Sequence, residues 1–206
     1  MSAADRLDMT VGDAIYSLRA IRRQRPDPIP EDDITAILDA AIQAPNGANM
    51  QLWHFLVVTD QNLRSQFAPL FEEAWWAKRH ESGFFTPEDL PDVYKAPMAL
   101  ASTIGNSPVL VFVCTTVAGL EAANSIVPSV QNLLLAARCL GIGGTITTLH
   151  SSVDERVHAL FEIPDTAQVV YCIPLGYPQG NFGPVTRKPL GEVTSYNQWG
   201  SALTDH

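Results

Sequence analysis

The sequence lacks any long hydrophobic run, and positive charge is scarce in it. None of its apolar stretches approaches the roughly 18 residues that a membrane-spanning helix needs. Thirteen Lys and Arg residues stand against 22 Asp and Glu residues, so the formal net charge is −9. Proteins that bind nucleic acids or dock on anionic membranes more often carry the opposite charge. We therefore expect neither nucleic acid nor a membrane as a partner.

Cysteine is also scarce. The three cysteines, Cys114, Cys139 and Cys172, are odd in number and widely spaced, and no CxxC pair occurs. This pattern argues against a disulfide framework and favours three thiols in the core. The first residues lack the basic and apolar regions of a signal peptide. These features predict a cytoplasmic protein.

The signatures of several catalytic classes are missing as well. The five histidines form no HExxH motif and no Cys/His cluster, so we expect no metal site. No G-x-S-x-G nucleophile motif occurs. The glycines at 141, 143 and 144 do not complete a dinucleotide fingerprint, because Ile146 takes the place of the third glycine. They follow a helical pattern, which favours a helix stop.

The composition and periodicity indicate a single folded domain over residues 1–206, with 46% hydrophobic and 17% charged residues. Apolar spacing predicts helices over residues 11–22, from Pro30 to the Pro45-Asn46-Gly47 turn, from Leu63 with a kink or restart at Pro69, from Val130 to a left-handed cap at Gly141, and from a capping box at Ser152. Strands are predicted over residues 54–59, 108–116, 144–149 and 168–175, with 108–116 central and buried on both faces. The order is not a regular βαβ alternation, so it favours a mixed α+β fold.

Two segments stand apart from this pattern. Residues 79–106 show no clear period, and we expect a lid or excursion over about residues 62–106. Its aromatic residues could shape an apolar pocket, although Trp75 could equally belong to the core. The arm over residues 178–206 carries Tyr196 and Trp199. Such aromatics favour a surface to cover, such as that of a partner subunit.

Four of the thirteen cations fall within seven residues. These are Arg19, Arg22, Arg23 and Arg25. One dense basic spot in an acidic protein indicates a small anionic ligand. On the predicted helix Arg19 and Arg22 would share a face, where guanidinium groups can hold a phosphate. The alternative is a solvated patch that pairs with the acids of residues 31–33.

The string Ala-Pro-Asn-Gly-Ala-Asn-Met-Gln-Leu-Trp-His-Phe spans residues 44–55 and joins a helix to a strand. Its small residues allow a close backbone approach, and its amides can bond a heterocycle or a phosphate. An ordinary polar loop with Trp53 in the core is the other interpretation.

Together these strings resemble the nitroreductase family of FMN-dependent oxidoreductases. The resemblance runs from about residue 12 to residue 200. It rests on five pieces that follow the family's order, at residues 18–23, 44–55, 131–143, 173–178 and 187–190. Each piece alone is weak, but five in register are specific.

The resemblance implies a nitroreductase-like α+β fold with a central mixed, mostly antiparallel sheet flanked by helices. It also implies an intertwined homodimer with FMN at the subunit interface and NADH or NADPH as the electron donor. Because the cofactor carries the chemistry, no catalytic side chain is expected.

The resemblance further implies which residues bind FMN. Arg19 and Arg187 would hold the phosphate and ribityl end, beside Ala20, and Arg22 would reach the N1/O2 side of the ring. The residues expected to line the flavin from the partner subunit are Pro45, Asn46, Gly47 and Asn49. Those expected near N5 are Thr147, Thr148 and Leu149, with Leu149 donating its backbone N–H.

Four residues depart from the family pattern. Leu18 and Ala20 replace an arginine and a serine at the first piece, and Asn46 and Leu52 replace a serine and a proline at the second. One positive contact and one hydroxyl are therefore missing.

The function expected from the resemblance is ping-pong hydride transfer from NAD(P)H to the flavin. A small conjugated acceptor such as a nitroaromatic or a quinone would then take the electrons. The alternatives are other flavin chemistry on this scaffold (dehalogenation or flavin degradation), a flavin-binding protein without turnover, and a structural dimer with a degenerate site.

Overall fold

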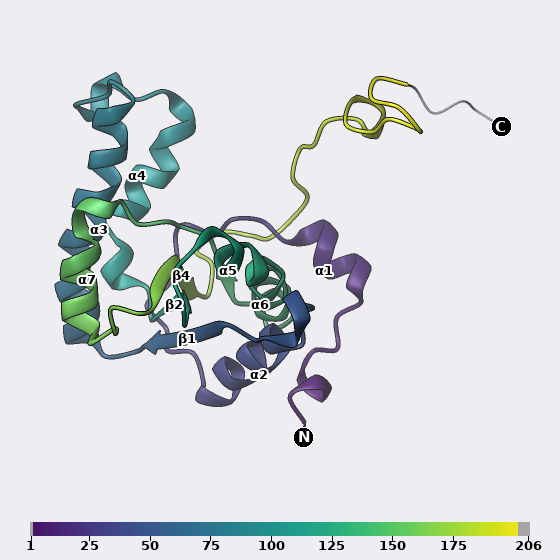
Figure 1. Cartoon of the computed structure of the whole chain (residues 1–206), viewed down its shortest axis with the longest axis horizontal. Helices are drawn as coiled ribbons and strands as arrows, with labels where there is room; N and C mark the ends of the chain where they lie inside the picture. The colour runs from purple at the N-terminus through teal and green to yellow at the C-terminus, as the bar shows by residue number, and fades with distance from the viewer. Residues whose placement is uncertain (1, 202–206) are drawn as a thin grey trace.

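A computed structural model describes residues 2–201 of the chain (Figure 1). At its centre lies a four-stranded sheet with the order β1-β2-β4-β3, in which all neighbouring strands are antiparallel. The strands are β1 (Trp53–Val58), β2 (Val109–Thr115), β3 (Gly143–Gly144) and β4 (Gln168–Gly176). The α+β class is confirmed. The sheet is antiparallel throughout, rather than mixed, in the part of the chain described.

Helices cover both faces of the sheet (Figure 1). The first layer consists of α1 (Val11–Ser17), α2 (Glu31–Ile42), α5 (Leu120–Ser125) and α6 (Val127–Cys139). The second consists of α3 (Gln61–Glu81), α4 (Lys95–Ala101) and α7 (Asp154–Phe161). Short 3₁₀ turns lie at Ala4–Arg6, Gly47–Asn49, Pro87–Asp89, Asp92–Tyr94, Ile104–Asn106, Ser151–Val153 and Leu190–Glu192.

Strand β2 lies between two hydrophobic cores. Val111 packs with Ile37 and Leu133 on the side of α2 and α6, whereas Phe112 packs with Phe67 on the side of α3. Successive strand residues point to opposite faces, and all seven residues of β2 are buried. The predicted central strand is therefore confirmed, as are the neighbouring strands β1 and β4.

The first helix is shorter than predicted. Helix α1 ends at Ser17, and residues 18–25, here called the strap, continue in an extended form. The Ile21 N–H donates to the Gly144 carbonyl at 2.9 Å, and the Arg25 N–H donates to the Tyr177 carbonyl at 2.7 Å. Backbone pairing along the β3–β4 edge thus replaces the helical bonds. The prediction that Arg19 and Arg22 share a helix face is wrong.

Three further local predictions can be compared with the structure. Helix α3 runs through Pro69 without a restart, because Phe67 and Phe71 on either side of it are buried in the core. The left-handed cap at Gly141 is confirmed by its φ of 72°. The prediction of a capping box at Ser152 is wrong, because the Ser152 N–H donates to the His150 ring and α7 begins only at Asp154.

The predicted strand over residues 144–149 is reduced to β3 and an isolated bridge. Gly143 and Gly144 pair with β4, and Thr147 pairs with Cys172 further along the same strand. Between these points the chain stays extended beside β4, so the segment still forms an edge of the sheet.

The proposed lid and arm both extend from the sheet layers in Figure 1. The upper ends of α3 and α4 project beyond the sheet on one side, and the chain after Tyr177 leads away from the body on the other. The Trp199 side chain is fully exposed, at 101%. The last part of the predicted arm, residues 202–206, lies outside the described residues. Within residues 2–201, no helix combines the length and hydrophobicity needed to span a membrane.

Candidate active site

Arg19 and Arg187 line one pocket of about 710 Å³, although they lie far apart in the sequence. Ala20 belongs to the same wall, and Gln131 and Leu134 of α6 form another. The remaining lining residues include Gly144, Thr145 and Ile146 from the sheet edge. The structure therefore brings together three of the predicted binding residues in one chain.

The two arginines are free to bind an anion. Neither takes part in an ion pair within residues 2–201. The alternative pairing with residues 31–33 is not formed by the strap, because Arg6 donates to Asp33 and lies 3.9 Å from Asp32. A phosphate is well matched to two unpaired guanidinium groups.

Close packing against glycine holds the strap at the sheet edge. A Cβ on Gly143 would lie 2.4 Å from the Ile21 Cγ1, so only glycine leaves room for this side chain. The Gln24 side-chain amide donates to the Gly143 and Pro174 carbonyls, both at 3.0 Å. The strap, and Arg19 with it, is thus anchored from one side.

Arg22 lies away from Arg19. It lines a second pocket of about 480 Å³, together with Arg23, Arg64 and Gln179. The structure thus does not bring Arg22 into the pocket of Arg19 and Arg187.

The three residues predicted near N5 continue the edge that lines the Arg19 pocket. The Thr147 N–H donates to the Cys172 carbonyl at 3.1 Å, and the Cys172 N–H donates to the Thr147 carbonyl at 2.9 Å. Beyond this bridge, neither Thr148 nor Leu149 donates its backbone N–H to another residue among those described. Two amides beside the pocket are therefore available to a ligand.

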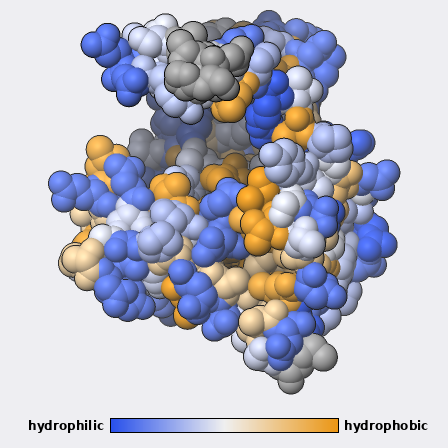
Figure 2. Space-filling model, turned by 90° about the vertical axis from the view of Figure 1, so that its right-hand side faces the viewer, coloured by the Kyte–Doolittle hydropathy of each residue, from blue (hydrophilic) through white to orange (hydrophobic). Residues whose placement is uncertain are grey.

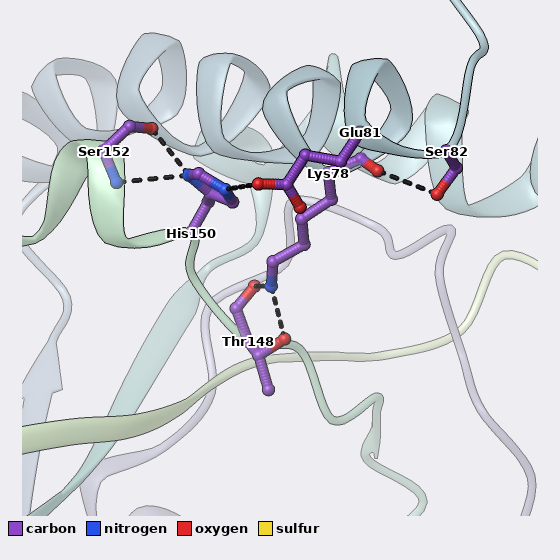
Figure 3. Close-up of polar contacts among 6 residues, drawn as sticks. All are labelled: Lys78, Glu81, Ser82, Thr148, His150 and Ser152. Atoms are coloured by element: carbon purple, nitrogen blue, oxygen red, sulfur yellow. Dashed lines mark hydrogen bonds and ion pairs between the residues drawn. The ribbon is translucent and has the colours of Figure 1, made fainter.

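A polar cluster connects this segment to the end of α3 (Figure 3). The Lys78 ammonium donates to the Thr148 carbonyl at 2.8 Å and to its hydroxyl at 2.5 Å. Burial lowers the pKa of Lys78. Glu81 lies 2.8 Å from His150. Sequence reasoning missed Lys78, because 70 residues separate it from Thr148 and no local motif marks the contact.

The loop before β1 lies away from the Arg19 pocket in its own chain. Pro45, Asn46, Gly47 and Asn49 do not line that pocket. The Asn46 side-chain oxygen accepts the Gln51 N–H at 2.8 Å, and the Gly47 N–H donates to Ser125 at 3.0 Å. These bonds hold a loop in which Asn49 and Gln51 both have a positive φ. The loop is thus a defined structure, with four exposed or half-buried residues that a second subunit could use.

Aromatic side chains gather on the projecting part of α3. The Arg79 guanidinium lies 5.2 Å from the Trp75 ring and 4.5 Å from the Tyr94 ring. The His80 ring stacks on Phe85 at 5.3 Å. Trp75 and His80 lie on the same helix as Lys78, whereas Phe85 and Tyr94 come from the segment that follows it, and together they form an aromatic wall.

Chemically, the site offers two cations, free amides and no metal ligands. Within residues 2–201, His, Cys, Asp and Glu form no group able to hold a metal ion.

The model of the nitroreductase family matches residues 15–177, which include the strap, the loop before β1 and the segment after β3.

The chain belongs to the nitroreductase family.

A relative from Methanothermobacter thermautotrophicus, provisionally named NADH dehydrogenase/NAD(P)H nitroreductase, supports this nitroreductase-family assignment. It is 30% identical over 182 residues, covering 85% of this chain and 81% of that protein. The enzyme class expected from the sequence is confirmed at the level of the family.

Two solved structures share the nitroreductase fold. Iodotyrosine deiodinase bound to FMN and 3-iodo-L-tyrosine has a TM-score of 0.77 and 22% identity, covering 92% of this chain and 100% of that chain. An FMN-dependent nitroreductase from Clostridium difficile has a TM-score of 0.68 and 21% identity, covering 88% and 97%. These neighbours carry the cofactor that the resemblance implied.

Proposed function

We propose that this chain is an FMN-dependent oxidoreductase that moves hydride from NADH or NADPH to N5 of the flavin and then to a small conjugated acceptor. The acceptor class is a nitroaromatic, a quinone or a similar compound, and the two half-reactions alternate in ping-pong order. The observation that carries this proposal is the meeting of Arg19 and Arg187 in one pocket. Bound FMN would supply the hydride relay between donor and acceptor.

The pocket residues fit the phosphate and ribityl end of FMN. Arg19 and Arg187 would bind the phosphate, since charge-assisted bonds from guanidinium groups are among the stronger contacts in proteins. Ala20 offers no hydroxyl, so its contact with the cofactor is limited to its backbone and methyl group.

The ring would lie along residues 147–149. The unpaired N–H of Leu149 is suited to donate to N5, with Thr147 and Thr148 beside it. Arg22 would reach the N1/O2 side by turning its long side chain out of the second pocket. A cation there would favour the negatively charged reduced flavin.

A second copy of the chain would complete the site. Exposed apolar side chains of α1 and of the arm, among them Ile15, Tyr16 and Trp199, favour burial in a homodimer. Figure 2 views this side and shows hydrophobic residues on the body below the arm. Pro45, Asn46, Gly47 and Asn49 would then line the flavin from the partner. We propose one domain per subunit, with a lid over residues 62–106 and an arm over 178–206, in the cytoplasm.

The test is flavin binding followed by anaerobic reduction. We expect the purified protein to show flavin absorbance, and NADH or NADPH to bleach it in the absence of oxygen. A nitroaromatic or quinone should then restore the oxidised spectrum. Absence of bleaching with both donors would contradict the reductase proposal.

Reductive dehalogenation is the second candidate, because iodotyrosine deiodinase bound to FMN and 3-iodo-L-tyrosine shares the fold. A product analysis with a halogenated aromatic substrate separates the two, since release of halide identifies dehalogenation. Consumption of the flavin itself would indicate flavin degradation. Bound FMN without turnover would indicate a flavin-binding protein.

A further inference from the structure

The end of helix α3 is fastened at two points to the segment that follows β3 (Figure 3). Lys78 donates to the Thr148 carbonyl and hydroxyl, and three residues later Glu81 pairs with His150. Both contacts join the projecting helix to residues next to Leu149. The two points thus fix this segment relative to α3.

The histidine contact is structural in character. The Ser152 N–H can only donate, and it lies 3.1 Å from the His150 Nδ1, so Nδ1 accepts. In the neutral ring, Nε2 then carries the hydrogen and donates to Glu81 at 2.8 Å. Both ring nitrogens are engaged, so His150 holds the segment through hydrogen bonds at each side of its ring.

The lysine contact acts on one particular peptide group. The Thr148 carbonyl and the Leu149 N–H belong to the same planar trans peptide, so they point in opposite directions. A donor fixed on the carbonyl at 2.8 Å therefore also sets the direction of the Leu149 N–H. The second bond, to the Thr148 hydroxyl, restricts rotation of the same residue.

We propose that Lys78 is a positioning residue for flavin reduction. Its ammonium group fixes the Thr148–Leu149 peptide so that the Leu149 N–H is directed at N5 of the flavin. This inference rests on the proposed function, since it requires FMN beside residues 147–149. Because α3 also carries Trp75 and Arg79, the same contact joins the aromatic wall to the flavin-facing peptide.

The experiment compares Lys78→Met with Lys78→Arg in the FMN-loaded full chain. Lys78→Met keeps the length of the side chain and removes the donor. We expect its rate constant for flavin bleaching in single turnovers with saturating NADH or NADPH to fall about tenfold, with the KM of the donor changed by less than about twofold. The visible spectrum of bound FMN should also shift, because the bond to N5 changes.

Lys78→Arg retains the charge and several N–H donors, so its bleaching rate should recover to within about threefold of the original protein. The control is Lys95→Met. Lys95 lies at the start of α4, pairs with Asp92 at 2.7 Å and is largely exposed. This variant should leave both the rate and the spectrum unchanged. A merely structural role would instead lower thermal stability without a rescue by arginine.

Two results would overturn the inference. One is a Lys78→Met protein with the original bleaching rate and flavin spectrum. The other is equal impairment of Lys78→Met and Lys78→Arg. If the unsubstituted protein binds no FMN, the proposed function itself fails, which is a distinguishable outcome.

Discussion

Arg19 and Arg187 are placed to bind an anion because nothing else in the described structure neutralises them. Asp33 forms an ion pair with Arg6, and Asp27 forms one with Arg25 at 3.0 Å. These two carboxylates are therefore neutralised by other arginines. A guanidinium group without a carboxylate partner loses little on meeting a phosphate and gains charge-assisted bonds. At the scale of the residue, the pocket stays cationic because Asp27 and Asp33 pair with other arginines.

Substitution of Arg19 or Arg187 by glutamine should weaken FMN binding. Loss of a hydrogen bond to a charged group costs about 1.5–3 kcal/mol, so the Kd should rise at least about tenfold. Fluorescence titration of the flavin-free protein measures this. Arg23→Gln is the matched control, because Arg23 lies on the same strap but lines the other pocket. Equal effects of Arg23→Gln and Arg19→Gln would count against the assigned phosphate site.

The cysteines give a second prediction at this scale. Burial raises the pKa of Cys114 to about 11 and raises that of Cys172 further. A raised pKa leaves less thiolate at pH 8, so these thiols should not react with a disulfide reagent in the native protein. Burial raises the pKa of Cys139 as well, but this thiol is only half-buried and a reagent can reach it. Only Cys139 should therefore react in the native protein, and slowly, whereas all three should react in denaturant. Fast native-state reaction of a Cys139→Ala variant would contradict this.

At the scale of the element, the strap is the segment that makes the site. Its conformation depends on pairing with Gly144 and Tyr177, which lie more than a hundred residues away. Glycine at position 143 allows the strap to approach closely enough for Ile21 to be buried. The position of Arg19 is thus coupled to the packing of a neighbouring glycine.

Gly143→Ala should therefore damage both stability and binding. Overpacking of this kind costs about 1–3 kcal/mol, and the displaced strap should raise the Kd for FMN. Urea unfolding and flavin titration measure the two effects. Gly180→Ala is the control, because a Cβ at Gly180 meets nothing within 4 Å. A Gly143→Ala protein as stable as Gly180→Ala would show that the strap can relax without cost.

At the scale of the whole molecule, the arm leaves apolar side chains in water. Leu190, Val193 and Trp199 are all exposed in the single chain. Groups of exposed apolar residues are typical of protein interfaces, and a homodimer would bury them. The loop before β1, which does not reach the Arg19 pocket in its own chain, fits the same arrangement.

We expect a native mass of twice the 22.4 kDa of the chain by light scattering. The double variant Leu190→Ser with Trp199→Ser should weaken the dimer at least about a hundredfold, since each buried apolar side chain contributes about 1.5–3 kcal/mol. It should also lose FMN, because the partner would contribute residues to the site. Val93→Ser, which changes an exposed apolar residue outside the arm, should leave the mass unchanged. A monomeric unsubstituted protein that binds FMN would refute the shared site.

Sequence reasoning succeeded where the responsible interactions are local. The uninterrupted apolar run of β2 predicts a strand buried on both faces, and Gly141 predicts a helix cap, because each depends on neighbouring residues alone. The five ordered strings are specific enough to name the family, and the resemblance that they carry predicts that Arg19 and Arg187 lie together, as they do in one pocket.

Tertiary contacts decided the rest. Residues 18–22 have a helical pattern, yet they are extended because the sheet edge offers their backbone better partners. This change sends Arg22 to a different pocket from Arg19. The bond from Lys78 to Thr148 joins two segments that no periodicity relates. A local pattern reports a residue's own preferences, whereas the competition between distant backbone and side-chain partners is settled only in the folded chain.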